Sequence, residues 1–583
     1  MKGTLIPGYK DLFGEADISY DDLLKNISSD TVIMLLASLN AELNTNEPHI
    51  ENQERLFRII TYRFNPQQIS HLKNALTQFK KTNADYNGTL FSRRYFLPMI
   101  LKELKRNNKM FVDENNPIHE YNFLVAYLII IDQVNEGDHV LLADAKRYNC
   151  QIMLTMPLIW ATSIHQYEYN ERSNPAFELF KLLCFCKYAY DKLRPFLKEL
   201  INNYGFKTIS QFTGSLFHVA KLTLNYQPNE VLRKLYFIVP KEGIRHDHLQ
   251  SLSFSLGSDD ISEVADLKRF PIYKTQKKGF MVVDEDFYKR KIYRGALFGL
   301  YKETTLSAGK SSFEDYKSDI SKRVFEEILF KGIASQLTGE NSWVIHFDTL
   351  FDKSEPDMYC RYENNIFLIE FKDYLFPDSV MYGKGFGKFK KYVDERFIRS
   401  QNGKSKGVSQ LSNCIYNLVN RKYCFDLMLD QKIKDREQLK IYPVICSTDF
   451  MFGMPGINEY LNILFSKQLR EKRCNISGIR PMVILSLEVL YDLALRGKSF
   501  LKLQELIENY HSILNHFRRE YLRDTGATGA YQIYLPSTAS FDEIYQTKFR
   551  SSMIDKSELT SDERIKRMTN IIDLNQDQMN EEL

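Results

Sequence analysis

The sequence has no run of apolar residues long enough to cross a bilayer, which takes about 18–20 residues. Its best run, Phe123–Ile131, has the length of a buried core element. No secretory leader is expected either, because Pro7 and Gly8 stand where such a leader needs an apolar region. These absences predict a cytoplasmic protein with no membrane partner.

Cysteine is scarce, and charge of one sign is not in excess. The 583 residues contain eight cysteines and no CxxC pair, which excludes a disulfide scaffold and a zinc ribbon. Lysine and arginine number 78 against 74 aspartate and glutamate, so the net charge is only +4. Any surface that binds nucleic acid must therefore be a local patch. What is present, 44% hydrophobic and 26% charged residues, is typical of a globular chain of several domains.

Residues 1–230 have the pattern of a helical domain. Asn65-Pro66 and Asn174-Pro175 each combine an N-cap residue with a first-turn proline ahead of an apolar run. Pro195 is expected to divide the second run, and Gly205 to end it. We expect a mainly α N-terminal half with a recognition or regulatory role, which binds a protein partner, a second copy of the chain or the target.

The segments on either side of the centre carry weaker signals. Residues 231–305 are expected to form a small α/β bridge, with a short strand and a hairpin that turns at residues 276–278. Residues 501–583 are expected to contain a C-terminal helix, followed from about Pro536 by a polar and partly disordered tail.

Residues 306–500 contain an informative order of elements. The apolar patterns predict a helix, three strands, a further helix and a buried strand, an α-β-β-β-α-β order that makes this part an α/β domain. Glu363-Asn364-Asn365 predicts the hairpin turn between the second and third strands. In chain order the expected elements are a helix from about Tyr316, strands at 343–347, 358–362 and 366–372, a helix at 408–420 and a strand at 441–446, after which another apolar run follows at 481–485.

The predicted hairpin brings three ionisable side chains together. Glu370 and Lys372 are two residues apart on one strand, so both project from the same face. Asp357 precedes the neighbouring antiparallel strand, and pairing about Asn364 places it beside Glu370 and Lys372. Two carboxylates and an ammonium at one sheet rim suit an oxygen-ligated divalent metal, Mg²⁺ or Mn²⁺. A structural salt bridge is the alternative explanation of Glu370 and Lys372 taken alone.

The combination resembles the PD-(D/E)xK nuclease superfamily. Its motif corresponds here to Pro356-Asp357 followed by Glu370-Phe371-Lys372, and the resemblance covers about residues 315–485. It implies a restriction-endonuclease-like αβββαβ core whose active site depends on Mg²⁺ or Mn²⁺.

The resemblance also implies roles for residues outside the hairpin. In that superfamily a glutamate of the preceding helix completes the metal shell, which here is Glu326, with the adjacent Glu327 as the alternative. A lysine and a glutamine open the next helix, as do Lys406 and Gln410. The implied metal ligands are Asp357, Glu370 and Glu326, and the implied catalytic residues are these three with Lys372 and Gln410.

A basic stretch, residues 384–406, follows the motif and predicts contact with a nucleic-acid backbone. Interleaved Phe386, Phe389 and Tyr392 are expected to stack on bases, and the alternative is a solvated flexible loop. The expected nucleic-acid-binding residues are Lys384, Lys388, Lys390, Lys391, Arg396, Arg399, Lys404 and Lys406.

The resemblance and the basic stretch together predict a metal-dependent nuclease. DNA is the expected substrate because the superfamily mostly cuts DNA, and the fusion to a large second half resembles bacterial restriction or phage-defence effectors. Two alternatives stay open. One is a non-catalytic nucleic-acid-binding subunit of a larger complex, and the other is a repair nuclease that processes DNA ends.

Overall fold

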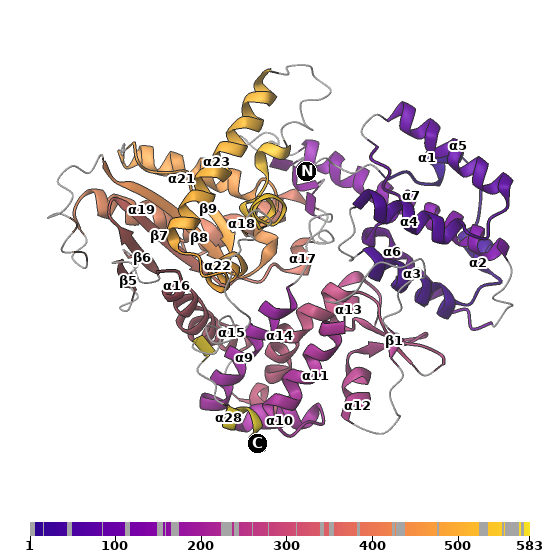
Figure 1. Cartoon of the computed structure of the whole chain (residues 1–583), viewed down its shortest axis with the longest axis horizontal. Helices are drawn as coiled ribbons and strands as arrows, with labels where there is room; N and C mark the ends of the chain where they lie inside the picture. Colours follow the sequence, from indigo (N-terminus) through magenta and orange to yellow (C-terminus); the bar gives the residue numbers. More distant parts are fainter. Residues whose placement is uncertain are drawn as a thin grey trace. The chain divides into compact units, whose positions relative to one another are not determined.

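The computed structural model is mostly helical, with two small mixed sheets (Figure 1). It describes residues 6–15, 17–43, 49–83, 86–110, 117–147, 156–157, 159–161, 163–164, 174–222, 236–237, 244–258, 261–277, 279–309, 312–338, 343–348, 355–381, 385–422, 426, 429, 438–474, 477–523, 535–550, 553, 571–572 and 576–583. Within these residues no helix combines the length and the apolarity needed to span a membrane.

The chain divides into two compact units. Unit 1 comprises residues 1–3, 141–171 and 314–573, and unit 2 comprises residues 4–140, 172–313 and 574–583. These boundaries differ from those of the four predicted domains. The predicted bridge, residues 231–305, lies in unit 2 together with most of the N-terminal helices. Residues 141–171 and 501–573 lie instead in unit 1, with the elements that carry the motif.

Unit 2 consists mainly of helices whose ends are set by local sequence. Asn65 and Asn174 cap α5 and α9 by accepting hydrogen bonds from the backbone of the first turn, as predicted. Pro195 lies in the first turn of α10 and separates it from α9, and Gly205 follows α10 with a φ of 77°. The helices are α1 (Tyr9–Phe13), α2 (Tyr20–Leu24), α3 (Ser29–Leu43), α4 (His49–Thr61), α5 (Pro66–Thr82), α6 (Arg93–Arg106), α7 (Pro117–Arg147, its last residues in unit 1), α9 (Pro175–Lys192), α10 (Arg194–Asn203), α11 (Ile209–Leu222), α12 (Ile244–Ser251), α13 (Val264–Arg269), α14 (Glu285–Lys302), η1 (Thr305–Ala308) and α28 (Gln576–Asn580).

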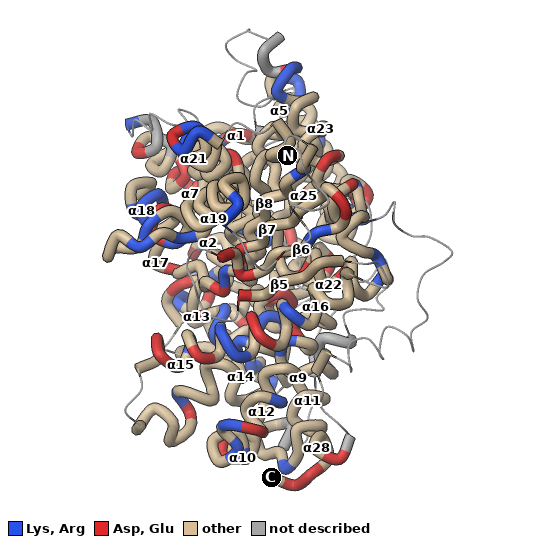
Figure 2. Tube along the Cα trace, turned by 90° about the vertical axis from the view of Figure 1, so that its left-hand side faces the viewer, with Lys and Arg blue, Asp and Glu red and all other residues tan. Residues whose placement is uncertain are grey.

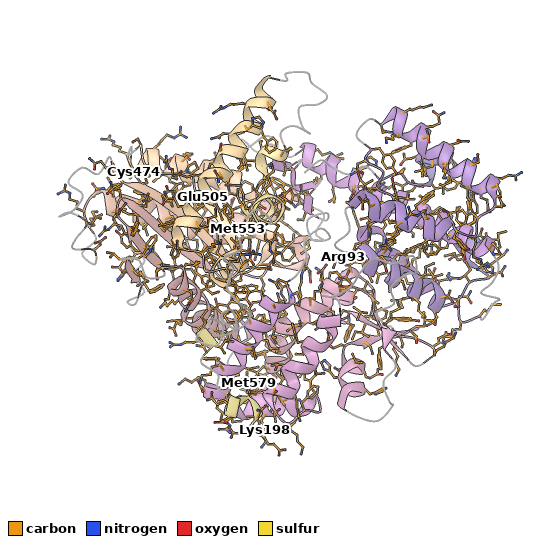
Figure 3. The ribbon with its side chains drawn as sticks, in the orientation of Figure 1. Arg93, Lys198, Cys474, Glu505, Met553 and Met579 are labelled. Atoms are coloured by element: carbon orange, nitrogen blue, oxygen red, sulfur yellow. The ribbon has the colours of Figure 1, made fainter. Side chains whose placement is uncertain are left out.

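A four-stranded sheet in the order β1-β4-β3-β2 completes unit 2. Its strands are β1 (Tyr236–Phe237), β2 (Ser253–Phe254), β3 (Ile272–Lys274) and β4 (Phe280–Val282). β3 and β4 form the predicted antiparallel hairpin. Directly after β4, buried Asp284 and Asp286 accept hydrogen bonds from buried Arg93 of α6, which is labelled in Figure 3. This ion-pair cluster joins α6 to the start of α14.

Unit 1 is organised around a five-stranded sheet in the order β5-β6-β7-β8-β9. The strands are β5 (Val344–Phe347), β6 (Met358–Tyr362), β7 (Asn365–Lys372), β8 (Lys440–Ser447) and β9 (Val483–Ser486). β5, β6 and β7 are antiparallel neighbours, whereas β8 and β9 continue the sheet in parallel with β7. The parallel pairing of β7 and β8 requires a crossover, and the helices between them supply it.

The helices of unit 1 follow the predicted order, with additions. A helix precedes β5, and α19 lies between β7 and β8, but two further helices, α17 and α18, occupy the stretch before α19. The helices are α15 (Phe313–Ile320), the π-helix η2 (Ser321–Phe330), α16 (Lys331–Thr338), α17 (Asp378–Met381), α18 (Phe386–Phe397), α19 (Gly407–Val419), η4 (Phe450–Gly453), α21 (Ile457–Glu471), α22 (Leu487–Leu495), α23 (Phe500–Arg523), η5 (Leu535–Thr538), α25 (Phe541–Ile544) and the π-helix η6 (Tyr545–Phe549).

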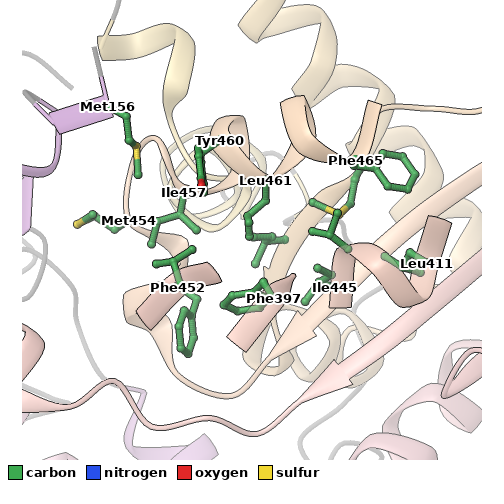
Figure 4. Close-up of a cluster of buried hydrophobic side chains, with 14 of the residues drawn as sticks. Met156, Phe397, Leu411, Ile445, Phe452, Met454, Ile457, Tyr460, Leu461 and Phe465 are labelled. Carbon is green, nitrogen blue, oxygen red and sulfur yellow. The ribbon is translucent and has the colours of Figure 1, made fainter. Parts of the chain in front are cut away.

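One face of this sheet packs against α18, α19 and α21. Ile366 and Leu368 of β7 belong to the same buried cluster as Phe389 of α18 and Leu411 of α19. Figure 4 shows part of this cluster, in which Met156 of the segment 141–171 lies close to Met454 and to Ile457 at the start of α21. The segment 141–171 thus supplies core side chains to the unit that carries the motif.

The C-terminal part of unit 1 is also part of its core. Phe541 and Tyr545 are fully buried, and Asp542 accepts a hydrogen bond from Ser486 N at the end of β9, 3.0 Å away. Tyr545 Oη donates to Asp492 of α22 at 2.7 Å. The polar composition of the last residues predicted a partly disordered tail from about Pro536, and the helices between Leu535 and Phe549 contradict it for these residues.

Candidate active site

The β6–β7 hairpin determines where Asp357 lies. Tyr362 pairs with Asn365 across a two-residue turn, and Met358 pairs with Ile369 at the other end of β6. Glu363 takes a left-handed φ of 51° in this turn. Because Asp357 precedes Met358, it comes opposite Glu370, as the alternating pattern of the two strands predicted.

Asp357, Glu370 and Lys372 form one hydrogen-bonded cluster. Lys372 Nζ donates to Glu370 Oε2 at 2.8 Å and to Asp357 Oδ2 at 3.4 Å. Asp357 Oδ2 also accepts a hydrogen bond of 2.6 Å from the backbone N–H of Phe371. The predicted convergence of the three side chains is therefore observed, and the backbone bond fixes the Asp357 carboxylate at the strand end.

Burial strongly affects the ionisation of this cluster. Glu370 has no solvent exposure, and burial together with the charge of Asp357 raises its pKa to about 8, against the opposing effect of Lys372. Burial acts to lower the pKa of Lys372, but the carboxylates of Asp357 and Glu370 raise it above its ordinary value. The lysine is consequently held as an ammonium ion by its two neighbours.

Glu326, rather than Glu327, faces this cluster. Burial and the charge of Asp357 raise the pKa of Glu326 to about 7, whereas Lys331 and Lys372 act in the opposite direction. Glu327 pairs instead with Arg323 on the exposed side of the helix, with 3.0 Å between Nη1 and Oε1. Both glutamates lie in the π-helix η2. Such helices are rare in proteins, and those that occur often lie at functional sites.

The different surroundings of Glu326 and Glu327 give a matched pair of variants. Glu326→Gln is expected to lower metal-dependent DNA cleavage by at least about tenfold, because a ligand contributes no less than the residues that only orient ligands. Glu327→Gln should leave activity within about twofold, because its partner Arg323 is solvent-exposed and the pair contributes little. Cleavage rates of the two variants check this expectation, and equal losses would contradict the assignment of Glu326.

Gln410 lies in the first turn of α19, on the sheet face that Glu370 and Lys372 share. The two-residue period of β7 directs Glu370 and Lys372 to the side of Ile366 and Leu368, which α19 covers. Gln410 Oε1 is buried and has no hydrogen-bond partner among the described residues. Among the described residues no hydrogen bond joins Gln410 to Asp357, Glu370 or Lys372, so its part in the site stays a prediction.

The donor set suits a hard divalent cation. Glu370 Oε1 is buried and unpartnered within the described residues, an arrangement that costs free energy until a cation or a donor reaches the oxygen. The described residues contain no group of three or more His, Cys, Asp or Glu side chains arranged to hold a metal, and Lys372 contacts both carboxylates instead. A cation would therefore share Asp357 and Glu370 with Lys372, and Glu326 would supply the third carboxylate.

The basic stretch is a helix and a tight turn, which corrects two expectations. Phe386 and Phe389 of α18 have no exposure and Tyr392 has 8%, so none of the three can stack on bases. Residues 386–397 form α18, and Arg399 and Ser405 pair across the turn that follows, so the flexible-loop alternative is also wrong here. Lys384 lies outside the described residues.

The basic side chains of this stretch differ in their partners. Lys390 Nζ pairs with Asp394 at 2.5 Å, and Lys391, 73% exposed, lies 3.8 Å from Glu395. Figure 2 shows how the lysine and arginine positions gather along α18. The exposed members are Lys388, Lys391, Arg396, Arg399 and Lys404, and Lys406 is half-buried at the start of α19.

Two contacts next to Lys372 were not predicted. Asp373 accepts hydrogen bonds from Lys317 of α15 and from Thr448 after β8, and so links the end of β7 to the helix that leads to Glu326. Tyr374 lies beneath the guanidinium of Arg396, with 5.1 Å between Cζ and the ring centroid. No local sequence pattern indicates either contact, because both join residues that are distant in the chain.

Comparison with protein-family models, curated proteins and solved structures finds no match for this chain.

Proposed function

We propose that the chain is a metal-dependent nuclease with a PD-(D/E)xK-type active site in unit 1. The observation that carries the proposal is the contact of Lys372 with both Asp357 and Glu370 at one strand end. Phosphodiester hydrolysis needs oxygen ligands for a cation and a positive group for the charge that develops, and this cluster offers both. A restriction-endonuclease-like core, suggested by the α-β-β-β-α-β order, belongs to the same proposal.

Each residue has a defined part in the proposed reaction. A bound Mg²⁺ or Mn²⁺ would polarise the phosphodiester and make a water molecule more acidic. Asp357, Glu370 and Glu326 would hold that ion through carboxylate oxygens. Lys372 keeps its proton beside two carboxylates, so it donates hydrogen bonds to the attacking water or to the phosphate oxygen rather than acting as a base. Gln410 would orient the same water or phosphate from α19.

DNA is the substrate that we propose, and the protein would act as a restriction or phage-defence effector by analogy with the superfamily. The exposed cations of α18 support a nucleic-acid substrate, because they lie on the helix that packs beside the strand of the motif. Unit 2 would bind the target, a protein partner or a second copy of the chain, and would so control cleavage.

The test is a cleavage assay with linear, closed circular and single-stranded DNA and with RNA. The purified chain is incubated with Mg²⁺, Mn²⁺ or EDTA, and a Lys372→Met variant is the matched control. The proposal expects metal-dependent cleavage of DNA that the variant lacks. Cleavage of linear DNA alone would indicate a nuclease that processes ends. Binding without cleavage under all metal conditions would contradict the proposal and favour a non-catalytic subunit.

The exposed lysines of α18 should bind backbone without reading sequence. We expect Lys388→Ala with Lys391→Ala to weaken DNA binding similarly for all sequences and to reduce the slope of log K against log salt by about 2, or roughly 0.9 per lost phosphate contact. Lys390→Ala is the matched control, because Lys390 is already paired with Asp394. A salt titration of binding measures both slopes, and an unchanged slope in the double variant would contradict the prediction.

A further inference from the structure

Arg396 differs from the other cations of α18 in how it is held. Its guanidinium carbon lies 5.1 Å from the ring centroid of Tyr374 and 5.2 Å from that of Tyr392. Two aromatic rings thus orient one planar cation, which favours a fixed direction over the freedom of an exposed lysine. Within the described residues no carboxylate lies at ion-pair distance from Arg396, whereas Lys390 and Lys391 each have one.

The two rings are fixed by the segment that leaves the active site. Tyr374 follows Lys372 by two residues, and its ring contacts buried Phe397 edge-on at 6.2 Å between centroids. Tyr392 Oη donates a hydrogen bond of 2.6 Å to the backbone oxygen of Leu375. These contacts join the end of α18 directly to the chain that continues from β7.

The Tyr374 phenol also connects Arg396 to the catalytic cluster. Burial raises the pKa of the Tyr374 phenol, the positive charges of Lys372 and Arg396 act to lower it, and the carboxylates of Asp357 and Glu370 act to raise it. The same phenol is therefore close enough to interact electrostatically with Arg396 and with the carboxylates of Asp357 and Glu370. An exposed guanidinium beside a site for phosphodiester hydrolysis is placed to bind a second phosphate of the same strand, through two parallel N–H donors.

We propose that Arg396, held between Tyr374 and Tyr392, binds the substrate phosphate next to the scissile one and fixes the register of the strand over Asp357, Glu370 and Lys372. The proposal rests on the proposed nuclease function and adds a positioning subsite to it. The ligand class is a phosphodiester backbone. A residue with this role affects the rate at saturating substrate, because a misplaced strand reacts slowly even when it is bound.

The test compares charge-preserving and ring-preserving variants of the full chain under single-turnover conditions. Arg396→Lys keeps the charge but loses the planar, stacked geometry, so the rate at saturating DNA should fall about ten- to hundredfold while affinity changes less than about threefold. Tyr374→Leu should resemble it, and Tyr374→Phe should stay near wild type because the ring remains. Lys467→Ala, which removes an exposed lysine of α21 with no part in the proposed site, should leave both the affinity and the saturated rate unchanged. A wild-type rate in Arg396→Lys at saturation would overturn the proposal.

A second readout separates this subsite from the nuclease proposal. If the wild-type chain cuts no substrate with Mg²⁺ or Mn²⁺, the proposed function fails, and binding of a short DNA duplex in EDTA then decides the subsite. A measurable loss of binding in Arg396→Lys and Tyr374→Leu, with Lys467→Ala and Tyr374→Phe at the wild-type level, would support a built phosphate site without chemistry. Wild-type binding in both subsite variants would reject it.

Discussion

Replacing Lys372 by methionine is expected to reduce the cleavage rate by about a hundredfold or more, with the fold retained. Methionine fills nearly the same volume but removes the ammonium that contacts Glu370 at 2.8 Å and Asp357 at 3.4 Å. Without it, the two carboxylates repel each other, and no positive group is left to stabilise the charge that develops on the phosphate. Single-turnover cleavage at saturating DNA and metal measures the loss.

The control for this variant is Lys388 of α18, a lysine that is exposed, whereas Lys372 is buried. Lys388→Met removes an exposed charge on α18 and should leave the saturated rate unchanged. Because Glu370 is fully buried, Lys372→Met is also expected to lower the free energy of unfolding, and cleavage is therefore measured at a temperature at which circular dichroism shows the variant folded. Near wild-type cleavage by Lys372→Met would remove the lysine from the active site.

Replacing Trp160 by alanine is expected to lower the free energy of unfolding of unit 1 by about 3–5 kcal/mol. Trp160 has no exposure, and its ring lies 5.6 Å from that of Phe386 and 6.0 Å from that of Phe389, both in α18. A large cavity would therefore open beneath the helix that carries the exposed cations. Urea denaturation, followed by the fluorescence of the remaining tryptophan, measures the change.

The chain offers its own matched control for this experiment. Its other tryptophan, Trp343, is also in unit 1 but only partly buried, against Tyr362 and Phe500. Trp343→Ala should cost clearly less than Trp160→Ala, and either variant retains a fluorophore in the same unit. An unchanged urea midpoint in Trp160→Ala would show that the segment 141–171 is not part of this core.

The predicted nuclease domain, residues 306–500, lacks this segment and Phe541, and as a fragment it should not fold.

The site was more predictable than the architecture around it. A two-residue strand period and a tight turn fix the positions of Asp357, Glu370 and Lys372, and both are local features of the sequence. Helix starts at Asn65 and Asn174 were predictable for the same reason, since capping depends on neighbouring residues.

The nature of the basic stretch was missed although a local signal existed. Phe386, Phe389, Val393 and Phe397 recur at helical spacing and are all fully buried in α18. The glycines ahead of them and the dense lysines suggest a loop, in which Phe386, Phe389 and Tyr392 would stack on bases. The periodicity of the aromatic residues carried more information than the local charge.

Other features could not be read from any local pattern. Trp160 packs against Phe386 and Phe389, which lie more than 200 residues further along the chain. Arg396 contacts Tyr374 only because α18 packs beside the end of β7. Asp426 likewise forms a buried ion pair with Arg361 of β6, at 2.5 Å, across 65 residues. Such contacts depend on tertiary packing, which the composition of each segment leaves open.

The central claim is that Asp357, Glu370 and Glu326 hold a divalent metal at which phosphodiester bonds are cut. Its most direct test is Mn²⁺ uptake, measured from the loss of the free-ion resonance signal, in the same samples in which DNA cleavage is followed. The wild-type chain and Glu327→Gln should take up Mn²⁺ and cut DNA, whereas Asp357→Asn should do neither at the same metal concentration. Metal uptake and cleavage by Asp357→Asn at wild-type levels would contradict the account.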